Sequence, residues 1–186
     1  MRIPYSLTFC LILIIIMACF PSPWCAAVQD SPVSSATTIP TTEDPRTTDV
    51  RKQLQTYYDE MGAGFAHFNM IDATKYFSKD YRSVDKFNRK RTLHHKRELY
   101  QRLLSRALES QMKTTITLCT LKGDTATVQT RVQIYAHIRR DDGMEAVVEG
   151  EDLSRDFWVR QGSIWVIKQS RDFDFTITVN GQKVIE

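Results

Sequence analysis

The chain of 186 residues is poor in glycine, proline and cysteine, and it carries little net charge. Seven glycines and six prolines exclude a collagen-like protein, and 42% hydrophobic residues exclude a fully disordered chain. The net charge of +3 is too small to indicate a polyanion-binding protein by itself. This composition leaves room for one ordinary globular domain.

Three of the four cysteines lie in the first 25 residues, inside a segment with the pattern of an export signal. The apolar run 6–20 is short for a membrane span, and Cys25-Ala26-Ala27 offers the small residues that a signal peptidase requires. We therefore predict a signal peptide, 1–27, and an exported protein, secreted or periplasmic, with Cys119 as its single cysteine and a small core residue. An alternative stays open. Ile16-Met17-Ala18-Cys19 resembles a bacterial lipobox, in which Cys19 would carry the lipid of a membrane-anchored lipoprotein.

A linker and three helices are predicted next along the chain. Residues 28–48 are rich in serine, threonine and proline, so they predict an extended linker before the folded domain, 49–186. Hydrophobic spacings of three and four then predict helices at 49–67, 69–77 and 94–109, with a short strand at 81–87 before the last of them.

From Met112 onward the hydrophobic period changes to about two, which indicates strands. Asn180-Gly181 predicts a tight turn in a terminal hairpin, 176–186. Short glycine-bearing connections make the long strands antiparallel neighbours. The predicted fold is α+β, a curved antiparallel sheet of four long strands plus a short first strand, wrapped around the N-terminal helices. The four long strands are expected at 114–121, 125–139, 146–160 and 163–175.

Two segments carry a family resemblance together with the order of the elements. One runs from Asp72 to Asp80 after the first helix, and the other, 156–167, contains Trp158, Gly162 and Trp165 around the last hairpin. Over residues 49 to about 175 the chain resembles the SnoaL-like, nuclear-transport-factor-2-like superfamily of cystatin-like cone folds. The resemblance implies a ligand cavity between the concave sheet face and the helices. It does not choose among the isomerases, cyclases, dehydratases, binders and dimerising modules of that superfamily.

Pairing around a hairpin turn at Gln161-Gly162 predicts which side chains line such a cavity. They form an aromatic floor and a polar end made by Asp152 and Arg171. In the alternative interpretation both tryptophans are core residues and the two charges form a salt bridge at the rim. The expected pairs are Trp158 with Trp165, Asp156 with Ile167, Ser154 with Gln169, and Asp152 with Arg171.

The resemblance also suggests a catalytic group. Asp85 falls on the first strand, where the ketosteroid isomerase branch carries its general base. That branch uses a tyrosine of the first helix as an oxyanion donor; Tyr57 and Tyr58 lie near this position, although Met61 occupies the best-spaced one. In the alternative interpretation Asp85 is a solvent-facing carboxylate beside Lys86.

Histidines offer one further candidate. His137 shares a face of its strand with Tyr135, so it is either an acid or base of the pocket or a hydrogen-bonded surface residue. The four histidines lack the spacing of a metal site, so no metal and no other cofactor is predicted.

A basic stripe follows the first strand. Between Lys86 and Arg106 lie eight basic residues and one acid, Glu98. The stripe predicts attraction to phosphate, an anionic lipid surface or an acidic polysaccharide, unless it is only the solvated face of a helix. Nucleic acid is not an expected partner of an exported protein.

The sequence therefore predicts an exported cone-shaped module that is non-catalytic and either binds a small apolar or carbonyl ligand or self-associates, with a homodimer as the expected assembly. The alternative is a cofactor-free isomerase, cyclase or dehydratase that uses a carboxylate or a histidine as general base.

Overall fold

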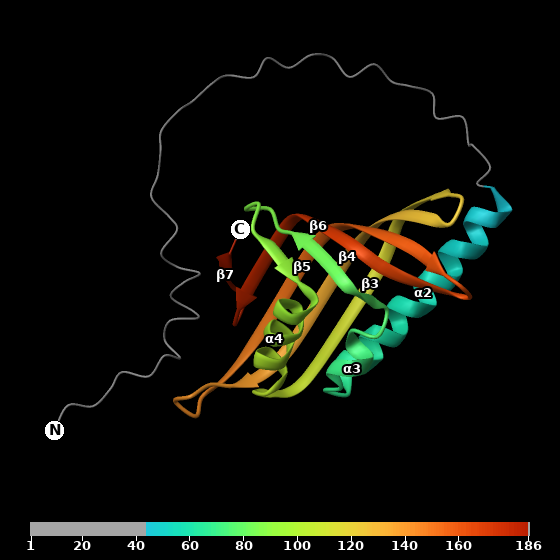
Figure 1. Ribbon diagram of the computed structural model, residues 1–186. Coiled ribbons are helices and arrows are strands. Elements are labelled where there is room, and N and C mark those ends of the chain that lie inside the picture. Colours follow the sequence, from blue (N-terminus) through green and yellow to red (C-terminus); the bar gives the residue numbers. More distant parts are fainter. Residues whose placement is uncertain (1–43, 186) are drawn as a thin grey trace, which may run out of the picture. The chain divides into compact units, whose positions relative to one another are not determined.

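The computed structural model describes residues 44–185. The predicted signal peptide, the lipobox with Cys19 and most of the predicted linker lie outside the described residues. In chain order the elements are α2 (Pro45–Ala66), α3 (Met70–Ala73), β1 (Phe77–Val84), β2 (Lys90–Thr92), α4 (Leu93–Leu104), β3 (Ala107–Lys122), β4 (Thr125–Arg139), β5 (Glu145–Gln161), β6 (Ile164–Val179) and β7 (Gln182–Ile185) (Figure 1).

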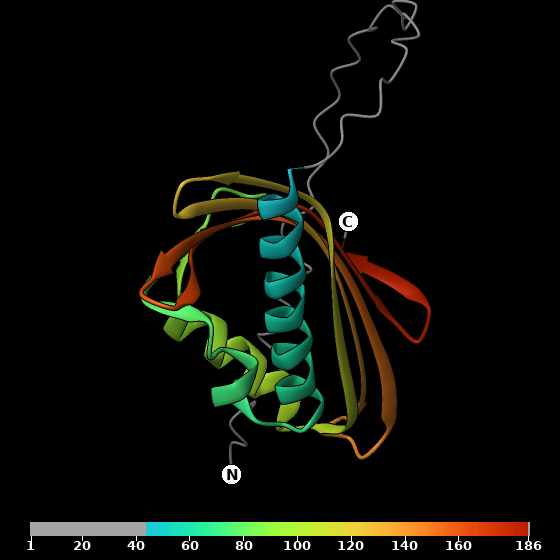
Figure 2. The ribbon, with the colours of Figure 1, turned by 90° about the vertical axis from the view of Figure 1, so that its right-hand side faces the viewer.

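The strands form one sheet in the order β2-β1-β6-β5-β4-β3, and β7 pairs with β6 beside this path. All pairings are antiparallel except that of β1 with β6. Figure 2 shows the sheet curving around α2, with α3 and α4 on the same side. The predicted α+β cone with four long strands is therefore confirmed. Across residues 44–185, no helix combines the length and the hydrophobicity that crossing a membrane requires.

Helix α2 begins four residues before the predicted boundary because the chain offers an earlier cap. The Asp44 side chain accepts the backbone N–H of Arg46 at 3.1 Å, and Pro45 occupies the first helical position, where its missing N–H is no loss. Two glycines near the end of α2, Gly62 and Gly64, let β3 and α3 come close to the helix. A Cβ at Gly62 would lie 2.4 Å from the carbonyl oxygen of Met112, so this residue type lets β3 contact the helix.

Two predicted helices are shorter than expected. The second helix covers Met70–Ala73 only, and β1 starts at Phe77. The third helix ends at Leu104, since from Ala107 onward the chain pairs with β4, beginning with Ala107 opposite Ile138. Tertiary pairing overrides the helical spacing of apolar residues there.

The core lies between α2 and the sheet. Leu54, Tyr58 and Met61 of α2 pack against Trp158 and Ile167 of the sheet, and all five are almost fully buried. Trp165 and Cys119 belong to the same cluster. The two tryptophans are therefore core residues.

The predicted register of the last long hairpin is wrong. Its closing pair is Gln161 with Ile164, and the register shifts twice between β5 and β6. The observed partners therefore lie two to four residues further along β6 than predicted, while the residues of β5 keep the predicted face. The observed pairs are Trp158 with Ile167, Asp156 with Ser170, Ser154 with Asp172, and Asp152 with Phe175. The terminal hairpin is as predicted, because Asn180 and Gly181 have φ of 51° and 75°, the left-handed pair that a tight turn needs.

Candidate functional site

A row of polar side chains lies on the concave face of the sheet. Alternation along β5 turns Asp152, Ser154 and Asp156 toward the helices, and β6 adds Ser170 opposite Asp156 and Asp172 opposite Ser154. We call Asp152, Asp156 and Asp172 the inner carboxylates. Three carboxylates on the inside of a small domain are unusual, since buried charge is costly unless it is paired.

The innermost of them, Asp156, has all the partners that it needs. Its Oδ2 accepts the Tyr58 hydroxyl at 2.5 Å and its Oδ1 accepts the Ser170 hydroxyl at 2.5 Å. The Trp158 indole N–H donates in turn to the Tyr58 oxygen at 3.0 Å. Burial raises the pKa of Asp156, while the hydrogen bonds from Ser170 and Tyr58 oppose that rise. This cluster ties α2 to β5 and β6.

Asp152 lies further along the same strand and lacks such partners. Its Oδ1 is buried and accepts no hydrogen bond from any described residue. Burial, followed by the charge of Asp172, raises the pKa of Asp152 to about 7. Burial also raises the pKa of Asp172. Asp152 is thus a carboxyl group with an unused oxygen that exchanges its proton near neutral pH.

Helix α4 brings the positive charge of the site. The Lys96 ammonium lies 4.9 Å from the ring centre of Phe77, 5.6 Å from that of Tyr100 and 5.9 Å from that of Tyr81. Burial alone would lower the pKa of Lys96, but the negative potential of Tyr100, Tyr81 and the inner carboxylates holds it well above its usual range. The Lys96 ammonium therefore stays charged and lies opposite the acidic face of the sheet.

The structure brings together several of the predicted pocket residues. Tyr58, Met61, Asp156 and Trp158 meet in the buried centre, and Asp152 lies on the same face. Tyr57 is half-buried, stacks on Tyr76 at 3.9 Å between ring centres and receives the Gln53 amide at its hydroxyl.

Other predicted residues lie away from this face. In β4, the residues opposite Asp156 and Asp152 are Val128 and Val132, so Tyr135 and His137 alternate onto the outer face. There His137 lies 3.0 Å from Glu145. The placement corrects the predicted pocket lining.

The predicted pair of Asp152 with Arg171 is also wrong. Arg171 is exposed and lies opposite Arg155, because the two register shifts carry it out of reach of Asp152.

Asp85 has a local structural role just after β1. Its carboxylate accepts the backbone N–H groups of Phe87 at 3.0 Å and Arg89 at 2.9 Å. The side chains of Arg89 and Arg91 bind the other oxygen at 2.7 and 3.2 Å. Burial alone would raise the pKa of Asp85, but the hydrogen bonds of Arg89 and its charge lower it on balance. Asp85 is therefore neither solvent-facing nor a base with an unused oxygen.

Three site residues were missed by sequence reasoning, Lys96, Ser170 and Asp172. Lys96 stands at a helical spacing with Leu93, Tyr100 and Leu104, which is the inward face of α4, and a lysine on such a face was the available signal. Asp172 gave no comparable signal because a strand bulge decides which way it points. Among residues 44–185, no group of three or more potential ligands is arranged to hold a metal ion.

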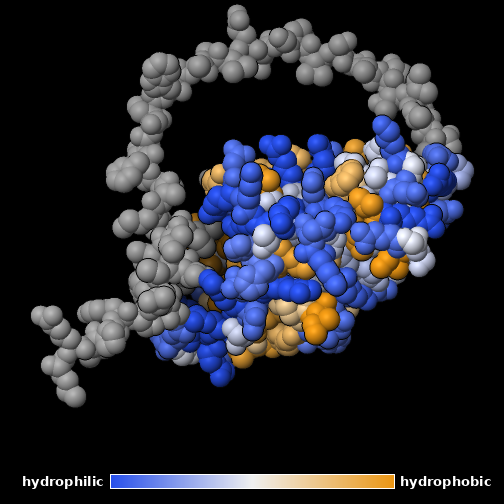
Figure 3. Space-filling view, in the orientation of Figure 1, coloured by the Kyte–Doolittle hydropathy of each residue, from blue (hydrophilic) through white to orange (hydrophobic). Residues whose placement is uncertain are grey.

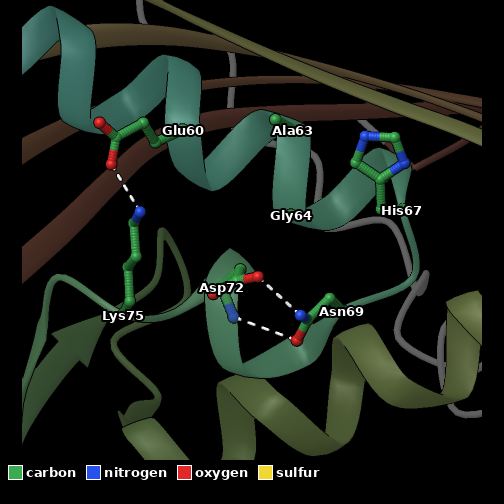
Figure 4. A pocket seen from close by; sticks show the side chains of 7 residues that line it. All are labelled: Glu60, Ala63, Gly64, His67, Asn69, Asp72 and Lys75. Carbon is green, nitrogen blue, oxygen red and sulfur yellow. Dashed lines mark hydrogen bonds and ion pairs between the residues drawn. The ribbon is translucent and has the colours of Figure 1, made fainter.

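A separate hollow of about 290 Å³ lies between α2 and α3 (Figure 4). Its charged groups satisfy one another: Lys75 lies 2.5 Å from Glu60, and the Asn69 amide donates to Asp72 at 2.6 Å. The Tyr76 hydroxyl donates to Glu60 as well, at 2.6 Å. These pairings leave little for a ligand to bind.

No family model and no curated protein matches the chain by sequence. Solved structures do match by fold. A conserved protein from Planctomyces limnophilus has a TM-score of 0.58 at 12% identity, over 67% of this chain and 94% of its own. A putative scytalone dehydratase from Novosphingobium aromaticivorans has a TM-score of 0.56 at 11% identity, and the match covers 70% of this chain and 89% of the dehydratase. A domain of unknown function with a cystatin-like fold from Nostoc punctiforme has a TM-score of 0.50 at 8% identity, and the match covers 68% of this chain and 77% of that domain. The chain thus has the nuclear-transport-factor-2-like cone fold; likeness at such identities extends to fold and no further.

Proposed function

We propose that the domain binds a small molecule on the concave face of its sheet, and that Asp152 is the group that receives it. The observation that carries this proposal is the buried Asp152 oxygen without a hydrogen-bond partner among the described residues. An unsatisfied buried oxygen lowers the stability of the folded state, so a native structure that keeps one has a use for it.

The charge of the site indicates the chemistry of the ligand. Three inner carboxyl groups face the ammonium of Lys96, and the charge of Arg91 also acts on Asp172, so the site has more acceptor oxygens than cationic donors. A ligand that donates a hydrogen bond or carries a positive charge would supply what Asp152 lacks. We therefore favour an amine or a hydroxyl compound over the apolar or carbonyl ligand that the sequence predicted.

Nuclear magnetic resonance titrations of the labelled protein test the proposal with three probes: benzylamine, catechol and cyclohexanone. We expect benzylamine or catechol to shift the amide signal of Asp152 and the indole signal of Trp158. Asp152→Asn should weaken that binding at least about tenfold. Glu151→Gln is the matched control, because Glu151 is the adjacent carboxylate on the outer face, 3.2 Å from Arg131. Equal weakening by both substitutions, or no shift with any probe, would contradict the proposal.

A second candidate function, acid–base catalysis, is favoured by the Asp152 oxygen without a hydrogen-bond partner among the described residues, which is available to accept a proton. The pKa of Asp152, about 7, is well matched to proton transfer at neutral pH. A structural neighbour bears the name of a dehydratase, which is compatible with this chemistry. Asp152 would serve as the base in place of Asp85 and His137.

Exchange of the α-protons of cyclohexanone for deuterium in heavy water tests this second function. The rate should rise as pH increases through about 7, because only the ionised Asp152 accepts a proton. Asp152→Asn should abolish the exchange, whereas Glu151→Gln should preserve it. Exchange no faster than in buffer would exclude this catalysis and leave the binding proposal standing.

A further inference from the structure

The structure sorts the eight basic residues between Lys86 and Arg106 into two groups. Four of them turn to partners elsewhere: Lys86 donates to the Phe175 carbonyl at 3.0 Å, Lys96 enters the concave site, Arg97 donates to the Thr74 hydroxyl at 2.9 Å, and Arg106 lies 2.9 Å from Asp141. The other four, Arg89, Lys90, Arg91 and Arg102, line a single hollow of about 320 Å³ together with His95, Glu98 and Leu99. We call it the basic hollow.

The walls of the basic hollow come from β2 and from the outward face of α4. Glu98 and Leu99 lie three and four residues after His95, and Arg102 lies four and three residues after them, so all four share one helix face. Strand and helix are joined by a capping box in which the Thr92 hydroxyl lies 2.8 Å from the His95 ring. In the orientation of Figure 1, hydrophilic side chains cover most of the surface over α4 (Figure 3).

Asp85 sits behind the basic hollow and orients two of its arginines. It binds Arg89 through Nε and Arg91 through one terminal nitrogen, so each guanidinium group is held while other N–H donors remain for a ligand. Lys90 and Arg102 are exposed, and neither makes an ion pair within residues 44–185. Four positive charges thus face two negative ones, those of Asp85 and Glu98, in one concave patch.

We propose that the basic hollow is a binding site for a phosphate monoester group. Arginine forks match the oxygens of such a group, and an oriented pair of them loses less entropy on binding than free side chains do. The hollow is also larger than one phosphate, which leaves room for the organic part of the ester. The phosphate could belong to a soluble metabolite or to a lipid headgroup; both present the same oxyanion.

Calorimetric titration of the purified protein with inorganic phosphate and with phenyl phosphate tests the site. The double substitution Lys90→Gln with Arg102→Gln should raise the dissociation constant for both probes at least about tenfold. Lys79→Gln with Lys122→Gln is the matched control, because it removes the same charge from two exposed lysines outside the basic hollow, and it should change the constant less than twofold. All four side chains are exposed, so both variants should unfold at the temperature of the native protein in phosphate-free buffer.

Sedimentation with vesicles distinguishes the two sources of the phosphate. Retention by phosphatidic acid vesicles but not by phosphatidylcholine vesicles, lost in Lys90→Gln with Arg102→Gln, would identify a lipid headgroup. Saturable binding of phenyl phosphate without retention would identify a soluble ester. Equal losses in both double variants, no saturable phosphate binding, or vesicle retention without phosphate binding would each overturn the site. Asp152→Asn should leave phosphate binding unchanged, so this inference stands or falls apart from the concave site.

Discussion

Tyr58→Phe isolates the contribution of the Asp156 cluster to stability. The substitution removes one hydroxyl and keeps the ring, which packs edge-on against Trp158 with 5.3 Å between ring centres. No cavity opens, so the effect reports hydrogen bonding rather than packing.

Two losses add up when that hydroxyl is removed. Asp156 loses one of its two side-chain donors, and a hydrogen bond to a charged group contributes about 1.5–3 kcal/mol. The buried Trp158 indole N–H loses its acceptor, and an unsatisfied buried donor costs about 1–3 kcal/mol. We expect a loss of at least roughly 2.5 kcal/mol in the free energy of unfolding at pH 8, which lowers the melting temperature by roughly 5–10 °C in a domain of this size.

The loss should depend on pH in a defined direction. The pKa of Asp156 is raised in the folded state by burial, and the Tyr58 hydrogen bond opposes that rise. Without Tyr58 the folded pKa climbs further above the unfolded value of about 3.9. Stability from a raised carboxyl pKa is present at low pH and lost as pH increases, so the variant is penalised more at pH 8 than at pH 5.

Urea denaturation at pH 5 and pH 8 measures both effects, and Tyr57→Phe is the matched control. The Tyr57 hydroxyl receives only the exposed Gln53 amide among the hydrogen bonds of the described chain, so its removal should change stability by at most about 0.5 kcal/mol. Equal losses in the two variants, or a Tyr58→Phe loss that does not change with pH, would refute the reasoning.

Three further predictions concern other positions. Asp152→Asn should be more stable than the native protein at pH 8 and should lose that advantage toward pH 5, because the folded pKa of about 7 means that the native carboxylate costs stability as pH rises; greater urea sensitivity of the variant at pH 8 would contradict this. Asp85→Asn should cost about 1–3 kcal/mol at pH 7 and progressively less in acid, since the stability from a lowered pKa is fully present above the unfolded value and is lost as pH falls through the folded one; a cost that does not change with pH in thermal melts would contradict this. Gly64→Ala should lower the free energy of unfolding by about 1–3 kcal/mol despite the better helix propensity of alanine, because its Cβ would lie 2.5 Å from the Ala73 nitrogen. Urea denaturation measures this loss, and an unchanged midpoint would show that α3 moves aside without cost.

Hydrophobic spacing and turn residues were sufficient to predict the order and type of the elements except β2, whose residues were expected to form a turn. Strand β4 has the predicted bounds, and Asn180-Gly181 turns as its residue types require. Boundaries failed where tertiary contacts compete with local preference, as at Ala107, whose segment has helical spacing but pairs with β4. Spacing within a short segment does not show which distant strand will pair with that segment, so it cannot predict the outcome of this competition.

The site was harder to predict than the fold because bulges and long side chains decide it. Alternation placed Asp152 and Asp156 on the correct face, but extra residues in β6 substituted Asp172 for Arg171 as the neighbouring charge. Lys96 reaches the site from a helix that the sequence assigned only a basic outer face. Asp85 matched a family position by strand order, yet two nearby arginines bind it in this chain.

Asp156 and Asp152 stand four residues apart on one strand and show how the same residue type serves opposite purposes. Asp156 lies where α2 and β6 supply donors to both of its oxygens, so its hydrogen bonds strengthen the contact between helix and sheet. Asp152 lies beyond the reach of those donors and beside Asp172, so its charge weakens the fold. The domain can keep Asp152 only because interactions such as those of Asp156 contribute enough stability to offset the cost of the Asp152 carboxylate. The step from a satisfied to an unsatisfied carboxylate along β5 therefore marks where the core ends and the proposed binding face begins.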